Sequence, residues 1–343
     1  DGYRSKVAGL RLNTDPTDRL HLQHSLGYFG TRETESFDIT SDQRVCQVDP
    51  TAGASETNCF LIGQAERTSA ADNAVEVRRL TGKGRYEYTL NRHALAAGWH
   101  VRDLHFDDRL SEKTVIEGQR DGTQERIVVD ILRDRAVFSE QQAGVFIQDA
   151  VDVLPERDRL VLTGGVRSDY YTLNDEWTVS PRLSARFSYN DQLTLTGSWG
   201  IYHQQPTYRE LRGTPQGGLS ISDALNRNIR SQRSMQVVLG GEYFFPDSRM
   251  YLRAEGYYKD LDDIISYTID DVRVDYSGEN DADGYTYGFD LQLRGEFVPG
   301  LESRFNYSFM VARERFKDEV LASYEDPTLR ENRQGLIPRP TDQ

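Results

Sequence analysis

The sequence predicts an all-β protein, an antiparallel transmembrane β-barrel that is present in part. Three observations favour this fold class. Apolar and polar residues alternate with a period of two along many segments, short turn-rich connections alternate with long polar ones, and no apolar run approaches the roughly 18 residues of a membrane helix. Because barrel strands alternate lipid-facing and water-facing side chains, a barrel is also compatible with the low mean hydropathy of −0.67.

The alternation can be checked residue by residue. In the segment 177–189, Val179 and Leu183 lie on one face, whereas Arg182 and Arg186 lie on the other. Several such segments exceed the roughly 5 to 6 residues of a typical strand and reach the ~9 to 11 residues that a tilted membrane strand needs. Aromatic residues gather toward segment ends, as they do at membrane interfaces: Tyr170, Tyr171, Trp177, Tyr189, Phe244, Phe245, Tyr257 and Tyr258.

The connections give an independent signal, because membrane barrels have tight turns at one end and long loops at the other. Tight links are predicted at 13–18, 91–92, 155–158, 190–191, 246–248 and 298–300. Long polar links are predicted at 31–72, 107–135, 205–230, 261–284 and 313–338, and the link near Asn174 is a short exception. Reading strands between these links gives about a dozen, with no domain linker, so residues 1–343 form one barrel domain.

Net charge, cysteine content and the N-terminal residues limit the classes of function and the cellular compartment that the sequence allows. A formal net charge of −14 without a basic segment argues against a nucleic-acid partner. Cys46 and Cys59 fall in a polar stretch without clear periodicity, and we interpret them as a loop disulfide in an oxidising compartment, with two unbonded thiols as the alternative. No metal site or cofactor is predicted, and the N-terminus does not look like a signal peptide, so we expect that the start of a longer protein is missing.

Two runs resemble the mid-barrel hairpins of the TonB-dependent receptors: GVFIQDAVDVLPERDRLVLTGGVRSDYY and SPRLSARFSYNDQLTLTGSWGIYHQQPTYREL. Three more resemble the approach to the last strands of that family: GYTYGFDLQLRGEF, LESRFNYSFMVARERF and IPRPTDQ. The resemblance is strongest over 137–343, and before that it rests on hairpin layout. It implies a 22-stranded barrel with an N-terminal plug, in the outer membrane of a Gram-negative bacterium.

The resemblance also implies partners: outer-membrane lipid, a nutrient ligand of small-molecule or oligomeric kind, and the TonB complex through a missing N-terminal region. We find no plug-like domain, no TonB-contacting segment and no closing strand with a terminal aromatic residue. We therefore expect a fragment of about a dozen strands from the larger barrel. Unpaired strand edges cannot face lipid, so the fragment alone should not insert stably.

Charged residues on the polar face are predicted to line the lumen or face a plug, although for any one of them the simpler reading is that it pairs with another charge or hydrates the wall. These residues are Arg167, Asp169, Arg182, Arg186, Glu242, Arg253, Glu255, Asp290 and Arg294. Aromatic and polar residues where strands enter outer loops are candidates for ligand contact: Tyr171, Tyr202, His203, Gln204, Tyr208 and Arg209. The acidic segment 260–283 lacks the spacing of a calcium loop, so a solvated negative surface is the expectation there and Ca²⁺ the alternative.

An enzyme is not predicted. None of the six histidines has a nucleophilic residue or a second metal ligand at a suitable spacing in the sequence, and no phosphate-binding loop or metalloprotease motif occurs. The function expected is active import of a scarce nutrient, of siderophore, oligosaccharide or peptide class, with energy from TonB. A passive channel or adhesin-type barrel is the alternative, and an outer-membrane hydrolase a further one.

Overall fold

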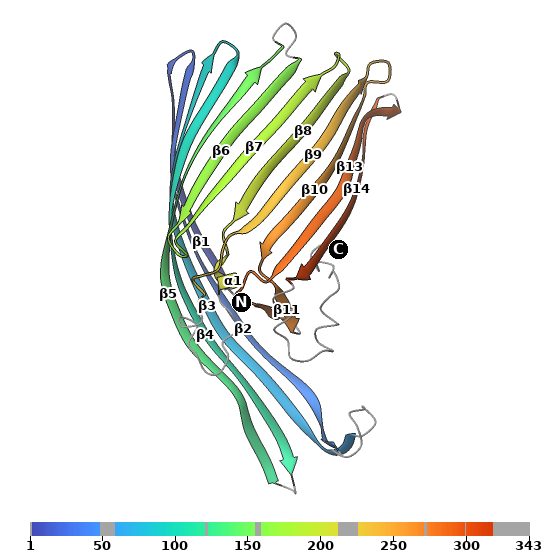
Figure 1. Cartoon of the computed structure of the whole chain (residues 1–343). Coiled ribbons are helices and arrows are strands. Elements are labelled where there is room, and N and C mark those ends of the chain that lie inside the picture. Colours follow the sequence, from blue (N-terminus) through green and yellow to red (C-terminus); the bar gives the residue numbers. More distant parts are fainter. Residues whose placement is uncertain are drawn as a thin grey trace.

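The computed structural model describes residues 2–48, 59–120, 123–154, 159–211, 226–270, 273–298 and 300–317, which are almost entirely β-structure (Figure 1). One short helix, α1 (Tyr208–Leu211), follows the eighth strand. The strands are β1 (Gly2–Thr17), β2 (Leu20–Val48), β3 (Cys59–Leu90), β4 (His93–Arg120), β5 (Thr123–Asp152), β6 (Leu160–Tyr171), β7 (Glu176–Ser188), β8 (Leu193–Gln204), β9 (Gln232–Phe245), β10 (Met250–Ile264), β11 (Tyr267–Asp270), β12 (Arg273–Tyr276), β13 (Ala282–Val298) and β14 (Leu301–Phe316).

Twelve strands form a single antiparallel sheet in the order β1 to β10, then β13 and β14, and β11 and β12 form a separate hairpin. Every neighbour in the large sheet is also the next strand along the chain, apart from the β11–β12 excursion. The predicted fold class and the predicted dozen strands are therefore confirmed. The sheet is curved, and α1 and β11 lie near the lower ends of β8 to β10 in Figure 1, while β2 to β5 extend further down. No helix in the described part of the chain is long and apolar enough to cross a bilayer.

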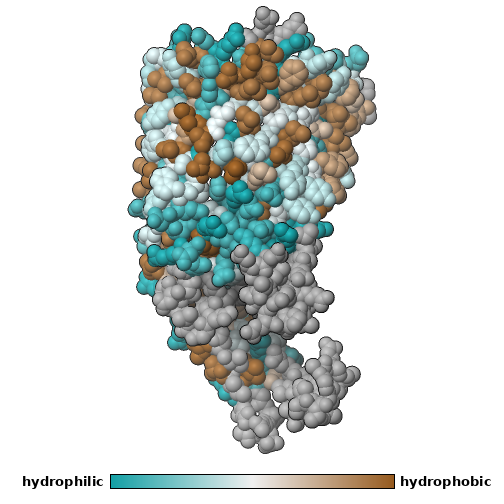
Figure 2. Space-filling model, viewed as in Figure 1, coloured by the Kyte–Doolittle hydropathy of each residue, from teal (hydrophilic) through white to brown (hydrophobic). Residues whose placement is uncertain are grey.

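The two faces of the sheet differ as the alternation predicts. On β7, Val179 and Leu183 are each 55% exposed, whereas Thr178 and Ser180 between them are 4% and 3% exposed. We call the face of Val179 the outer face and the face of Thr178 the inner face. On the side shown in Figure 2, apolar side chains spread over the upper strands and hydrophilic ones form a band below. The apolar row is not packed against another layer of the described protein, as a sandwich would require.

Where the structure describes them, the tight turns lie where the sequence predicts them, with one correction, and the predicted turn at 155–158 lies outside the described residues. Asn91 occupies the left-handed region with φ of 50° in the turn between β3 and β4, which asparagine tolerates. The first turn is not the whole segment 13–18, because β1 runs to Thr17 and a register shift between Thr14 and Thr17 accommodates Pro16. Proline fits there because β1 is an edge strand of this sheet. We call the end of the wall at which these tight turns lie the turn end, and the opposite end of the strands the outer end.

Two of the long links were wrongly predicted as loops. The described parts of 31–72 and 107–135 belong to strands β2 to β5, which contain 29, 32, 28 and 30 residues, against 12 or 13 in β6 to β8. At ~3.3 Å per residue, the extra length projects roughly 50 Å beyond the shorter strands. Both faces of a strand in water can be polar, so its composition resembles that of a loop. Threonine and serine pairs cross these strands, as between Thr40 and Thr68, whose hydroxyl oxygens are 3.3 Å apart.

The predicted disulfide lies at the tip of the β2–β3 hairpin. The backbone register pairs Val48 with Cys59 and Cys46 with Leu61, so the strands approach the cysteines more closely than the loop interpretation allowed. The side chains of both cysteines lie outside the described residues, and the bond stays a prediction. The long link 313–338 also falls largely outside the description, since β14 ends at Phe316.

Candidate functional site

The strand register brings all nine predicted lumen residues onto the inner face. Across the wall, Arg167 pairs with Ser180, Arg182 with Gly200, and Gly200 with Gln236. The same parity continues through Glu242–Arg253, Glu255–Asp290 and Tyr251–Arg294. The face is thus common to Arg167, Asp169, Arg182, Arg186, Glu242, Arg253, Glu255, Asp290 and Arg294, while a role in contacting a plug stays a prediction.

Several of these charges pair with one another. Arg167 donates two hydrogen bonds to Asp169, at 2.7 and 2.8 Å. Arg253 donates to Glu255 at 2.8 Å and lies 3.9 Å from Glu242. Short-range pairing of this kind is the simpler of the two readings that the sequence allowed, and it stiffens the wall at low energetic gain because most of these groups remain partly hydrated.

At the outer end of β5 to β7, the inner face carries a set of buried polar residues. Asp169, Thr178 and Ser180 belong to it, together with Glu140 and Gln142 on β5. Buried polar groups cost free energy unless they are hydrogen-bonded. Their burial here indicates that other segments cover this part of the wall.

One covering segment follows β8. The Gln205 side chain hydrogen-bonds to both Glu140 and Gln142, and the Gln142 amide also donates to Glu140 at 2.6 Å. Since β6 and β7 separate β8 from β5 in the sheet, the chain after β8 crosses the inner face to reach β5. Glu140 lies two positions beyond the level of Tyr171, the last residue of β6. Burial raises its pKa, while the Gln205 hydrogen bond and the charge of Arg102 oppose the rise.

A glycine permits a second cross-strand contact. The His100 ring lies 3.4 Å from the Asp169 carboxylate, although Gly144 of β5 stands between the two residues in the register. A Cβ atom on Gly144 would lie 2.2 Å from an Asp169 oxygen and 2.3 Å from the His100 ring. Only glycine leaves room for this contact across β5.

Apolar side chains hold several outer segments together. Leu173, Leu211, Ile229 and Ile265 form a buried cluster, which we call the outer cluster, and Phe138 on the inner face of β5 packs against it. These residues come from the β6–β7 turn, α1, the approach to β9 and the link between β10 and β11. Because each segment is too short to bury a core alone, their stability depends on this shared contact.

Hydrogen bonds beside the outer cluster join two of its segments. Glu176 at the start of β7 accepts hydrogen bonds from the Ser231 hydroxyl at 2.6 Å and from the Ser231 amide at 3.0 Å. Asn174 donates to the carbonyl of Ile229 at 2.8 Å. Both contacts join the β6–β7 turn to the approach to β9.

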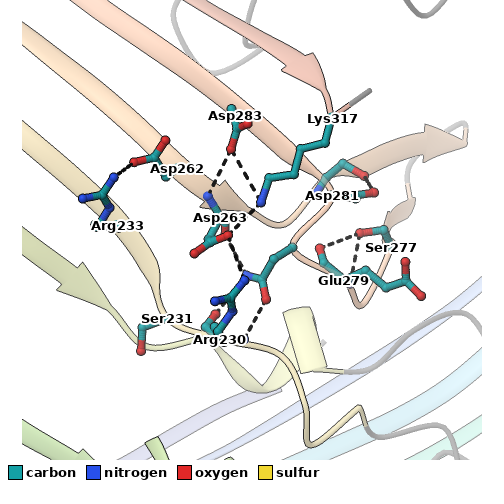
Figure 3. Close-up of polar contacts among 12 residues, drawn as sticks. Arg230, Ser231, Arg233, Asp262, Asp263, Ser277, Glu279, Asp281, Asp283 and Lys317 are labelled. Atoms are coloured by element: carbon teal, nitrogen blue, oxygen red, sulfur yellow. Dashed lines mark hydrogen bonds and ion pairs between the residues drawn. The ribbon is translucent and has the colours of Figure 1, made fainter. Parts of the chain in front are cut away.

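The acidic segment 260–283, from the end of β10 to the start of β13, forms an ion-paired network at the outer end (Figure 3). Asp263 accepts a hydrogen bond from Lys317 at 2.7 Å and lies 3.6 Å from Arg230, and Lys317 also lies 3.6 Å from Asp283. The Asn280 side chain donates to the Asp263 carbonyl at 2.7 Å. The network therefore ties together the ends of β9, β10, β13 and β14.

This network changes the interpretation of the acidic segment. Asp262 pairs with Arg233, and Asp281 accepts hydrogen bonds from the Ser266 amide and hydroxyl at 2.9 and 2.6 Å. The carboxylates of Asp262, Asp263, Asp281 and Asp283 are engaged by protein donors instead of forming a wholly solvated surface. Within the described residues, no group of three or more His, Cys, Asp or Glu side chains could hold a metal ion.

The structure brings three of the six candidate ligand residues to the buried polar region. Tyr171 is buried on the inner face of β6, Tyr202 lies under the Arg182 guanidinium at 4.8 Å, and a His203 nitrogen lies 3.0 Å from the Ser180 hydroxyl. Gln204 is exposed. The side chains of Tyr208 and Arg209 lie outside the described residues.

Sequence reasoning missed the β4 and β5 part of this region. Arg102, Glu140 and Gln142 share the inner face, and Arg102 donates to the Gln142 side-chain oxygen at 2.9 Å. The period of two from Glu140 through Gln142 to Gly144 was available as a signal. It was overlooked because the adjoining segment 107–135 was interpreted as a loop.

Comparisons with known proteins agree with this architecture. A family model described as TonB dependent receptor-like, beta-barrel matches residues 1–340. No curated protein sequence matches the chain. Among solved structures, the RagAB peptide transporter matches 92% of this chain and 37% of its own, with 14% identity and a TM-score of 0.50. The copper transporter OprC matches 92% of this chain and 56% of its own, with 15% identity and a TM-score of 0.52.

The chain thus spans between about a third and somewhat over half of the solved chains that it matches. At these identities the likeness concerns the fold, and it does not transfer the peptide or the copper to this chain.

Proposed function

The chain belongs to the TonB-dependent receptor-like β-barrel family, and on this premise we propose that it captures a scarce nutrient at its outer end and imports it with energy supplied through TonB. Barrels of this family lie in the outer membrane of Gram-negative bacteria, which is the location of this chain. The ligand class proposed is that of siderophores, oligosaccharides or peptides.

The observation that carries the proposal is the covered inner wall at the outer end. Gln205 and the outer cluster fasten short connections onto the inner face of β5, beside Tyr171, Tyr202 and His203. A wall covered in this way favours gated capture over free diffusion. Aromatic rings and planar polar groups together suit polar ligands, because they combine stacking area with directional hydrogen bonds.

Import by this route needs energy. We propose that the TonB complex, engaged through an N-terminal region of the whole receptor, supplies it from the inner membrane. The chain itself contributes the wall and the capture residues, and no enzymatic step is part of the proposal.

Whole-cell uptake tests the proposal. Labelled ferric siderophores, oligosaccharides and peptides would be offered to cells that express the native receptor, with and without a functional TonB and with a protonophore. We expect uptake of one class, lost without TonB or with the protonophore. Uptake that persists in both conditions would identify a passive channel and contradict the proposal.

Residue roles are tested in the same assay. Replacing Tyr202 by Ala removes a ring that lies beside Arg182 at the outer end, and we expect weaker capture at limiting ligand. Tyr258→Ala is a matched control, because this tyrosine is exposed on the outer face. Equal effects of both substitutions would contradict a capture role for Tyr202.

A further inference from the structure

The inner face of β3 and β4 carries a group of basic side chains that the proposed function does not use. Arg79 and Lys83 on β3 are exposed, and Arg102 on β4 is partly buried. All three share the parity of the inner face, since Lys83 pairs with His100, Thr81 with Arg102, and Arg102 in turn with Gln142. We call these three residues the basic patch.

The register sets the spacing of the basic patch. Arg102 stands directly opposite Thr81, so it is a diagonal neighbour of both Arg79 and Lys83. Diagonal neighbours in an antiparallel pair lie about 7 to 8 Å apart, within reach of long side chains. The three positive charges can therefore converge on one small anionic group. Without such a group, their mutual repulsion disfavours the arrangement.

The carboxylates near the basic patch accept their hydrogen bonds from other residues, although the charge of Arg102 also acts on Glu140. Asp169 accepts both hydrogen bonds of Arg167, and Glu140 accepts the amides of Gln142 and Gln205. Among the described residues, Arg79, Lys83 and Arg102 form no ion pair with a carboxylate.

The contacts that the basic patch does make leave donors free. Arg102 donates to a neutral amide oxygen of Gln142 at 2.9 Å, and its Nε atom is buried without a hydrogen-bond partner. The Arg79 guanidinium lies 5.2 Å from the centre of the Phe29 ring, a cation–π contact that does not use its N–H groups as hydrogen-bond donors to an oxygen.

We propose that the basic patch binds an anionic group, a carboxylate or a phosphate, on the ligand that the barrel imports. Arginine presents donors in a planar fork that matches the paired oxygens of these groups, and lysine adds a point charge. The site lies on the inner wall beside Gln142, at the level of the covered outer end. The inference rests on the proposed import function, to which it adds the charge of the ligand.

Direct binding tests the inference without transport. The native protein, purified from outer membranes in a neutral detergent, would be titrated with citrate by calorimetry at low ionic strength. We expect citrate to bind, and Arg102→Gln or Lys83→Gln to weaken binding about tenfold or more, because each removes a charge-assisted contact. Salt at about 1 M should weaken binding further, since Arg79 and Lys83 are exposed to solvent.

The control variant is Arg304→Gln, which removes the same charge from the inner face of β14 near the turn end. We expect it to bind citrate as the unaltered protein does. Equal affinity for all variants would show that the basic patch is not the site. Absence of citrate binding by the native protein would also overturn the proposal, because the basic patch would then not take up a carboxylate ligand.

The two proposals fail separately. Energised uptake without citrate binding would reject the anion site and leave import standing. Citrate binding that depends on Arg102, combined with uptake that ignores TonB, would reject energised import and leave the anion site standing.

Discussion

Replacing Ile229 by Ala tests whether the outer cluster holds the outer segments on the inner wall. Ile229 is 1% exposed and packs with Leu173, Leu211 and Ile265. Truncating a buried isoleucine to alanine costs ~2 to 5 kcal/mol, through lost transfer free energy and the cavity left behind. Because the outer segments have little other apolar core, we expect the substitution to lower mainly the free energy of their local opening from the inner wall, and not that of unfolding the wall.

Hydrogen exchange measures this equilibrium amide by amide. A loss of ~2 to 5 kcal/mol raises the open population about 30-fold to a few thousand-fold. The increase should appear at the amides of Leu211, which donates to the Thr207 carbonyl at 3.1 Å, and of Asn226, which donates to the Leu211 carbonyl at 3.2 Å. Amides in the ladder between β6 and β7 should exchange as before, because the wall does not depend on Ile229.

Leu239→Ala is the matched control. Leu239 is 66% exposed on the outer face, so lipid or detergent fills the space and no cavity forms. Unchanged exchange at Leu211 and Asn226 in the Ile229→Ala variant would refute the reasoning. A uniform acceleration over wall and outer segments would refute it as well, since it would show that the two parts open together.

Two further predictions concern the wall and the projecting hairpins. Leu183→Arg, on the outer face, should destabilise the barrel in liposomes by ~2 to 4 kcal/mol if Leu183 lies near the bilayer midplane. The control, Ser198→Arg on the inner face, should cost much less. Equal folding yields of the two variants would contradict the face assignment. The Arg135 and Arg109 guanidiniums hold the pKa of Asp107 well below its usual range, so its stabilising effect is present above the ordinary carboxyl pKa and is lost as pH falls through the lowered one. The protection of amides in the β4–β5 hairpin against hydrogen exchange, corrected for intrinsic exchange rates, should therefore fall at acid pH, and Asp107→Asn should remove this pH dependence. A pH dependence that is the same in the variant would contradict the role of Asp107.

Much of the wall could be predicted from the sequence, because membrane strands follow a local rule. Side chains alternate between lipid and water, so the apolar Val179 and Leu183 and the charged Arg182 and Arg186 report their faces without knowledge of partners. The turn at Asn91 was equally local. The projecting parts of β2 to β5 escaped prediction, because strands with water on both faces have no apolar side to reveal them.

The candidate site was predictable only in part. Tyr171, Tyr202 and His203 could be chosen because they lie where strands enter outer connections. Gln205 could not be linked to Glu140, because their contact joins residues 65 positions apart and depends on how a connection crosses two intervening strands.

By itself, the sequence determined which residues face lipid and which face the interior, and that the chain is a β-wall, since a period of two is a property of neighbours in the chain. Tertiary structure alone decided which outer segments meet on the inner wall and which carboxylates are already paired. It also made Arg102 a diagonal neighbour of Arg79 and Lys83 on the inner face. Those outcomes depend on the register between strands and on the curvature of the sheet, which bring distant residues within a few ångströms of one another.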